Sequence, residues 1–118
     1  MRIWGSNISI VEPSGEVGRF EGQLLLKNIL NLIQHRWKKI VLDLGEVEHI
    51  HYRVLAELGT VLSESDGQVG TVKLANLNSY HRELLKVAGV DHFFETYDSV
   101  AEAVLSFESP LSQACNLQ

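Results

Sequence analysis

The chain has 118 residues, 45% hydrophobic and 21% charged, which is the composition of one globular domain with its own core. A net charge of −5 argues against nucleic acid as a partner, and the single cysteine, Cys115, excludes an internal disulfide and a cysteine-rich zinc site. No apolar run reaches the length of a membrane span and the first residues do not resemble a signal peptide, so we expect a cytoplasmic protein without membrane contact.

The first third of the chain predicts strands followed by a helix. Residues 2–4 and the alternating residues 8–10 favour strands, and the segment 13–15 then favours either a bulged strand or a hairpin. Residues 20–35 change to a helical period with a wide apolar stripe, which predicts packing on a sheet. A small basic patch at residues 35–39, interrupted by Trp37, suits the C-terminal end of that helix.

The centre of the chain holds the clearest strand and the clearest helix. Residues 40–44 form an apolar, β-branched run that predicts a buried strand. From Val54 onward, apolar residues at helical spacing predict an amphipathic helix over residues 54–66, which Gly67 ends. Between them lies the segment of residues 48–53, Glu-His-Ile-His-Tyr-Arg, which we call the junction. The question of function depends on this junction.

The last third of the chain predicts four further elements. They are a strand over residues 69–75, a helix capped by Asn78 or Ser79, an edge strand at the aromatic residues 90–95, and a helix that begins with the capping box Ser99–Glu102. Helices that alternate with strands favour a largely parallel sheet with right-handed crossovers. We therefore predict one α/β domain over residues 1–108, with a mostly parallel mixed sheet of four to five strands and about four helices, and a flexible tail over residues 109–118.

In this order and spacing, the elements resemble the STAS domain family over roughly residues 8–107. The resemblance rests on the strand at residues 39–44 with Val47 and Ile50, and on the segment VKLANLNSYHRELLKVAGVDHFFETYDSVAEAV at residues 72–104. It implies a STAS-like fold and a regulatory role like that of anti-sigma factor antagonists.

The resemblance also implies where the functional site lies. In that family the corresponding segment carries Asp-Ser-Ser/Thr-Gly, and an anti-sigma factor with kinase activity phosphorylates one of the serines. The four positions here are His51, Tyr52, Arg53 and Val54, and none of them matches, although Asp43 matches the family's strand aspartate. We therefore expect a protein partner, with a kinase-type anti-sigma factor as the candidate, but no serine phosphorylation switch.

The junction also lacks the residues that ordinarily cap a helix. No residue from 49 to 54 is Ser, Thr, Asp or Asn, so we expect a lost cap that costs about 1 kcal/mol. Three interpretations of the junction stay open. It keeps only a structural role, or His51 and Arg53 receive a partner's carboxylate or phosphate beside the helix N–H groups, or Tyr52 is phosphorylated, which only its position supports.

Metal and enzyme chemistry are not expected. His49 and His51 would share one face of a strand, but no third ligand lies near them in sequence, so we predict neither a metal nor a cofactor. The chain has no phosphate-binding glycine loop, dinucleotide fingerprint or nucleophile elbow. Arg53, Glu57 and Thr60 have helical spacing, typical of a solvated face or of a docking face adjoining the junction.

We predict a non-enzymatic protein–protein interaction domain resembling anti-sigma factor antagonists. Its predicted partner surface contains His49, His51, Tyr52, Arg53, Glu57 and Thr60. The alternative is a ligand-sensing or scaffold domain of the same fold within a larger assembly. In that case the junction and a strip of small residues bind a small anion or a lipid-like molecule; the strip comprises Ala56, Gly59 and Ser63. A homodimer is left open.

Overall fold

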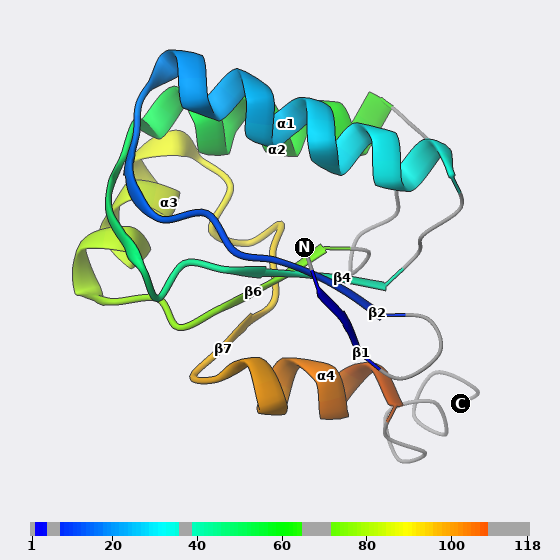
Figure 1. Ribbon diagram of the computed structural model, residues 1–118. Coiled ribbons are helices and arrows are strands. Elements are labelled where there is room, and N and C mark those ends of the chain that lie inside the picture. The colour runs from blue at the N-terminus through cyan, green and yellow to red at the C-terminus, as the bar shows by residue number, and fades with distance from the viewer. Residues whose placement is uncertain (1, 5–7, 36–38, 65–71, 109–118) are drawn as a thin grey trace.

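The computed structural model describes residues 2–4, 8–35, 39–64 and 72–108, which contain a five-stranded sheet (Figure 1). The strand order is β1-β2-β4-β6-β7, with the bounds β1 Arg2–Trp4, β2 Ile8–Val11, β4 Lys39–Asp43, β6 Val72–Ala75 and β7 Thr96–Tyr97. β2, β4, β6 and β7 are parallel, whereas β1 pairs with β2 in the antiparallel sense. The predicted α/β fold with a mostly parallel mixed sheet is therefore confirmed.

Helices cover both faces of this sheet. Their bounds are α1 Arg19–Gln34, α2 Tyr52–Glu64, α3 Ser79–Ala88 and α4 Val100–Glu108. α1, α2 and α3 pack on one face, and α4 packs on the other (Figure 1). α2 begins at Tyr52, two residues before the apolar stripe that starts at Val54, so the last two residues of the junction belong to the helix.

The two faces of the sheet enclose two separate apolar cores. Successive residues of a strand point to opposite faces, so Ile40 and Leu42 of β4 join the core beneath α1, α2 and α3, whereas Val41 joins the core beneath α4. The smaller core beneath α4 consists of Ile8, Ile10, Val41, Ala75, Ala103 and Val104. The larger core positions α2, and with it the junction.

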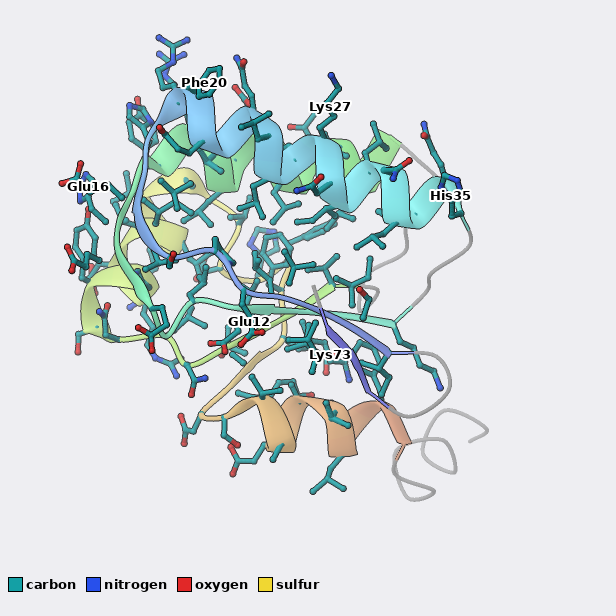
Figure 2. All side chains as sticks on the ribbon, in the orientation of Figure 1. Glu12, Glu16, Phe20, Lys27, His35 and Lys73 are labelled. Carbon is teal, nitrogen blue, oxygen red and sulfur yellow. The ribbon has the colours of Figure 1, made fainter. Side chains whose placement is uncertain are left out.

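One lysine is buried in the smaller core. Lys73 of β6 pairs in register with Val41 and so faces α4, as Figure 2 shows. Its Nζ atom donates to Ser106 Oγ at 2.7 Å and lies 4.2 Å from the centre of the Phe107 ring. Burial lowers the pKa of the Lys73 amine, and the Glu95 carboxylate at 3.7 Å opposes that change.

A second, two-stranded sheet was not predicted. β3, Gly15–Val17, pairs in parallel with β5, Val47–Ile50, and the register shifts between Gly15 and Glu16. Both predictions for residues 13–15 are therefore wrong, since β2 ends at Val11 and β3 is a separate strand that pairs with β5 rather than with β2. β5 escaped prediction because its buried residues lie at its two ends, without alternation.

The edge strand predicted at residues 90–95 is wrong. Gly89 ends α3 in the left-handed conformation with φ at 77°, and residues 91–94 then form turns. Phe94 is buried in the larger core, so the aromatic residues anchor a turn and do not extend the sheet. The strand β7 begins only at Thr96.

Both predicted helix caps on the C-terminal side are present. The Asn78 Oδ1 atom accepts from the His81 N–H at 2.8 Å at the start of α3. The Ser99 Oγ atom accepts from the Glu102 N–H at 3.1 Å, but the Glu102 carboxylate accepts from the Asp98 N–H instead of completing the box at Ser99. Several predictions fall outside the described residues, namely Gly67 as a helix end, the strand at residues 69–71, the side chain of Ser63 and the tail at residues 109–118.

Candidate functional site

The junction joins β5 to α2 and lies beside β3. β5 ends at Ile50 and α2 begins at Tyr52, so His51 alone separates them. The His51 N–H donates to the Val17 carbonyl at 3.0 Å, and the His51 carbonyl accepts from the Val54 N–H at 3.0 Å. These two backbone hydrogen bonds fix the direction in which α2 leaves the small sheet.

The imidazole of His51 caps α2. Its Nδ1 atom accepts from the Arg53 N–H at 3.1 Å, in the place where an Asp or Ser side chain ordinarily accepts. The bond requires an unprotonated Nδ1, so the ring proton of the neutral imidazole is on Nε2. The predicted loss of the cap is therefore wrong, because histidine, which is outside the usual set of capping residues, accepts the hydrogen bond from the Arg53 N–H.

Exposed side chains follow this cap. Tyr52 is 41% exposed and stacks on the His51 ring, with the ring centres 5.1 Å apart. The Arg53 Cζ atom lies 6.0 Å from the centre of the Tyr52 ring, at the outer limit of a cation–π contact. Val54 is buried against Gly22 of α1. The junction therefore presents an imidazole, a phenol and a guanidinium together, and Val54 belongs to the core.

His49 forms a second aromatic pair with a residue that sequence analysis did not select. The Tyr80 hydroxyl lies 2.5 Å from His49 Nδ1, and the two ring centres are 5.4 Å apart in a stacked arrangement. Tyr80 comes from the first turn of α3, far from His49 in sequence. His49 and His51 thus have different partners, and among the described residues no group of three or more His, Cys, Asp or Glu could hold a metal ion.

Beneath this pair, His81 fastens α3 to β5. Its Nε2 atom donates to the Val47 carbonyl at 3.1 Å, and its Nδ1 atom accepts from the Asn78 N–H at 3.3 Å. Burial lowers the pKa of the His81 imidazole, against the smaller effect of its bond to Val47. A neutral His81 therefore holds Tyr80 next to the junction. Sequence analysis did not select His81 and missed this role.

The remaining predicted site residues lie along α2. Glu57 and Thr60 are exposed, and the Thr60 hydroxyl donates to the Ala56 carbonyl at 3.2 Å. Gly59 is buried, and a Cβ atom added to it would lie 2.9 Å from Val90 Cγ1. Gly59 therefore serves close packing, which argues against an open pocket along the small residues of α2.

The chain matches the family model described as the STAS domain over residues 5–103. Its fold is similar to that of TM1081 from Thermotoga maritima, a candidate anti-sigma factor antagonist, with 22% identity and a TM-score of 0.71 over 88% of this chain and 90% of that one. A sulfate transporter family protein from Wolinella succinogenes has 19% identity and a TM-score of 0.69, over 92% of this chain and 93% of that one.

The anti-sigma factor antagonist SpoIIAA, in its unphosphorylated form, has 11% identity and a TM-score of 0.65 over 92% of this chain and 96% of that one. At these identities the likeness establishes the fold alone. No curated protein matches the chain in sequence. Within the described residues, none of the helices combines the length and the apolar character that a membrane crossing requires.

Proposed function

Because the chain belongs to the STAS domain family, we propose that it is a non-enzymatic regulatory domain that binds a protein partner through the junction. Structures of anti-sigma factor antagonists share its fold, so the proposed partner is a kinase-type anti-sigma factor. Serine phosphorylation at residues 51–54 does not control this binding.

The observation that carries this proposal is the exchange of hydroxyl groups for aromatic rings at the start of α2. Residues 51–54 contain neither serine nor threonine. The His51 imidazole already occupies the capping position, so the helix end is satisfied without an acid or an aliphatic hydroxyl. The proposed binding therefore does not depend on phosphorylation of a serine or threonine at these positions.

The exposed side chains around the cap have the chemistry of a protein interface. Tyr52 and Tyr80 are 41% and 38% exposed, and Arg53 lies beside Tyr52. Tyrosine and arginine are the residue types that most often dominate binding energy at interfaces. Stacking on His51 and His49 restricts the two tyrosine rings before a partner arrives, which reduces the entropy lost on binding.

The test is a titration of the purified chain with each kinase-type anti-sigma factor of the same genome, followed by calorimetry. We expect a complex that Tyr52→Ala and Arg53→Ala each weaken by about tenfold or more, as for central interface residues. Lys86→Ala is the matched control, because Lys86 is exposed on α3 and carries only a surface ion pair with Glu83. No complex with any of these proteins contradicts the proposed partner, and a complex that both junction variants leave unchanged contradicts the proposed surface.

The ligand-sensing alternative makes a different prediction. A small anion or lipid head group that binds at His51 and Arg53 would raise the melting temperature in proportion to the logarithm of its concentration. The close packing of Gly59 on Val90 disfavours a pocket along the small residues of α2. Thermal unfolding with a panel of anionic metabolites discriminates the two functions. If a metabolite strongly raises the melting temperature and His51→Ala abolishes this effect, the ligand-sensing function is supported instead of partner binding.

A further inference from the structure

Three histidine side chains lie in or beneath the proposed partner surface, and each uses its Nδ1 atom in a hydrogen bond. His51 Nδ1 accepts from the Arg53 N–H at 3.1 Å, and His81 Nδ1 accepts from a backbone N–H at 3.3 Å. His49 Nδ1 lies 2.5 Å from the Tyr80 hydroxyl. Histidine is the side chain whose charge ordinarily changes between about pH 5 and 8. The effect of a proton on Nδ1 differs among the three.

The hydrogen bonds of His49 and His81 are the less sensitive ones. A hydroxyl both donates and accepts, so the Tyr80 hydroxyl can stay bonded to His49 whether or not Nδ1 carries a proton. His81 is buried, and burial lowers the pKa of its imidazole, so the neutral form persists to lower pH. The Tyr80 side of the surface therefore resists acidification.

The imidazole of His51 has neither protection. The residue is half-buried, and the donor that it accepts from is a backbone N–H, which cannot accept in return. A proton on Nδ1 would place two N–H groups against each other, so the ring must turn away from the Arg53 N–H. The backbone does not turn with it, because the His51 N–H is bonded to the Val17 carbonyl and the His51 carbonyl to the Val54 N–H.

The side chains that follow His51 depend on the position of its ring. Tyr52 stacks on the imidazole with the ring centres 5.1 Å apart, and the Arg53 Cζ atom lies 6.0 Å from the centre of the Tyr52 ring. An imidazolium also attracts an aromatic face, but in the present stacked position its Nδ1–H would meet the Arg53 N–H. Protonation also adds positive charge to a helix N-terminus that already carries a guanidinium. Acid therefore changes both the shape and the charge of this surface.

No carboxylate among the described residues is bonded to the His51 ring to offset that charge. The two strands of the small sheet and the first turns of α1, α2 and α3 carry the charged residues Glu16, Arg19, Glu21, Glu48, Arg53 and Arg82. The Glu21 carboxylate accepts from the Gly18 N–H. Within the part of the chain that the structure describes, the ion pair that involves a histidine joins His92 to Asp91 at 3.8 Å. The neutral ring is thus the form that fits this surface.

From this geometry we propose that His51 makes the junction a proton-sensitive binding surface. The partner binds while the His51 imidazole is neutral and is released when that ring is protonated. The inference rests on the proposed function, because it names the regulation of the same surface. A partner that binds only the neutral form loses affinity by up to about tenfold for each pH unit below the pKa of the group. The domain thus responds to acidification without a covalent modification.

The first measurement uses the purified chain alone. We expect the amide nitrogen and proton chemical shifts of Arg53 to titrate together with the His51 ring between about pH 8 and 5, because the hydrogen bond from this amide is lost. His51→Asn should abolish that titration, since asparagine caps a helix and does not ionise. A wild-type Arg53 amide that stays constant over this range overturns the proposal.

The second measurement is the calorimetric affinity for a kinase-type anti-sigma factor at about pH 7.5 and pH 5.5. We expect binding about tenfold weaker at the lower pH for the wild type and a much smaller change for His51→Asn. The difference between the two proteins cancels any titration of the partner itself. His92→Asn is the matched control, because it removes an exposed histidine and should keep the pH dependence of the wild type. Circular dichroism at the lower pH verifies that each variant stays folded.

The outcomes distinguish this inference from the proposed function. No complex at either pH contradicts the proposed function, and with it the release of a partner by acid. A complex whose affinity is equal at both pH values, or higher at about pH 5.5, overturns only the proton-sensitive surface. So does His51→Asn with the pH dependence of the wild type, because the titrating group would then lie elsewhere.

Discussion

Replacing Gly22 by alanine tests the contact that sets α2, and therefore the junction, against α1. A methyl group on Gly22 would lie 2.2 Å from Val54 Cγ2 and 3.1 Å from Val54 Cγ1. Carbon atoms prefer a separation of about 3.5–4.0 Å. The helices must therefore separate by more than about 1 Å, or Val54 must leave the one side-chain conformation that valine prefers in a helix.

The expected magnitude follows from two opposing terms. Overpacking of a core costs about 1–3 kcal/mol, and the depth of this overlap places Gly22→Ala at the upper end. Alanine in place of glycine inside a helix contributes about 1 kcal/mol of helix propensity. The variant should therefore lose about 2 kcal/mol of unfolding free energy and melt roughly 6–10 °C lower than the wild type.

A double-mutant cycle measured by urea unfolding isolates the contact. Val54→Ala removes both methyl groups that the new side chain would meet, so Gly22→Ala in that background should be neutral or stabilising by up to about 1 kcal/mol. Gln23→Ala, at the exposed neighbouring position, should stay within about 0.5 kcal/mol of the wild type. Equal destabilisation by Gly22→Ala with valine or alanine at position 54 would refute the proposed contact.

Substitutions at three further positions test single side chains. His51→Ala should lose about 1 kcal/mol of unfolding free energy. His51→Asp should be at least as stable as the wild type, because aspartate caps α2 and complements its dipole. Unchanged urea unfolding of His51→Ala would disprove the imidazole cap. The lowered pKa of His81 means that the folded protein binds fewer protons than the unfolded chain. The free energy of unfolding should therefore fall as the pH drops below about 6.5. Urea unfolding at a series of pH values should show a smaller fall for His81→Gln. Lys73→Met should be neutral or stabilising by about 1 kcal/mol at pH 7, since the Ser106 hydroxyl keeps its hydrogen bond to the Ala103 carbonyl. A much lower melting temperature for this variant would contradict the prediction. Because burial lowers the pKa of Lys73, the stability of the wild type should increase relative to that of Lys73→Met as the pH rises towards 10.5.

The elements that sequence analysis predicted are those whose signals are local. The apolar run at residues 40–44, the stripe from Val54 and the Asn78 cap each follow from neighbouring residues, and all three are present. β5 was missed because the pattern of Val47–Ile50 has no alternation, and its pairing with β3 depends on residues far away in sequence.

The candidate site was chosen by resemblance to a family, and its internal contacts were not predictable from the sequence. No pattern near His49 indicates Tyr80, because the fold brings the first turn of α3 to the end of β5. Histidine is an uncommon cap, so propensity alone predicted that α2 begins without one. Lys73 points to the opposite face of β6 from Val72 and Leu74, and the sequence alone did not show that α4 covers that face, where a lysine would ordinarily meet water.

The central position of β4 has a consequence for how fast the chain folds. β4 pairs in parallel with both β2 and β6, and each pairing closes a crossover that contains a whole helix. Such contacts lose chain entropy before they gain burial, so folding should be slower than in a helical bundle of similar size. Shortening Leu42 should then slow folding, whereas changes at the junction should mainly accelerate unfolding. Refolding from urea in a stopped-flow instrument would separate the two rates and show whether the junction forms after the sheet.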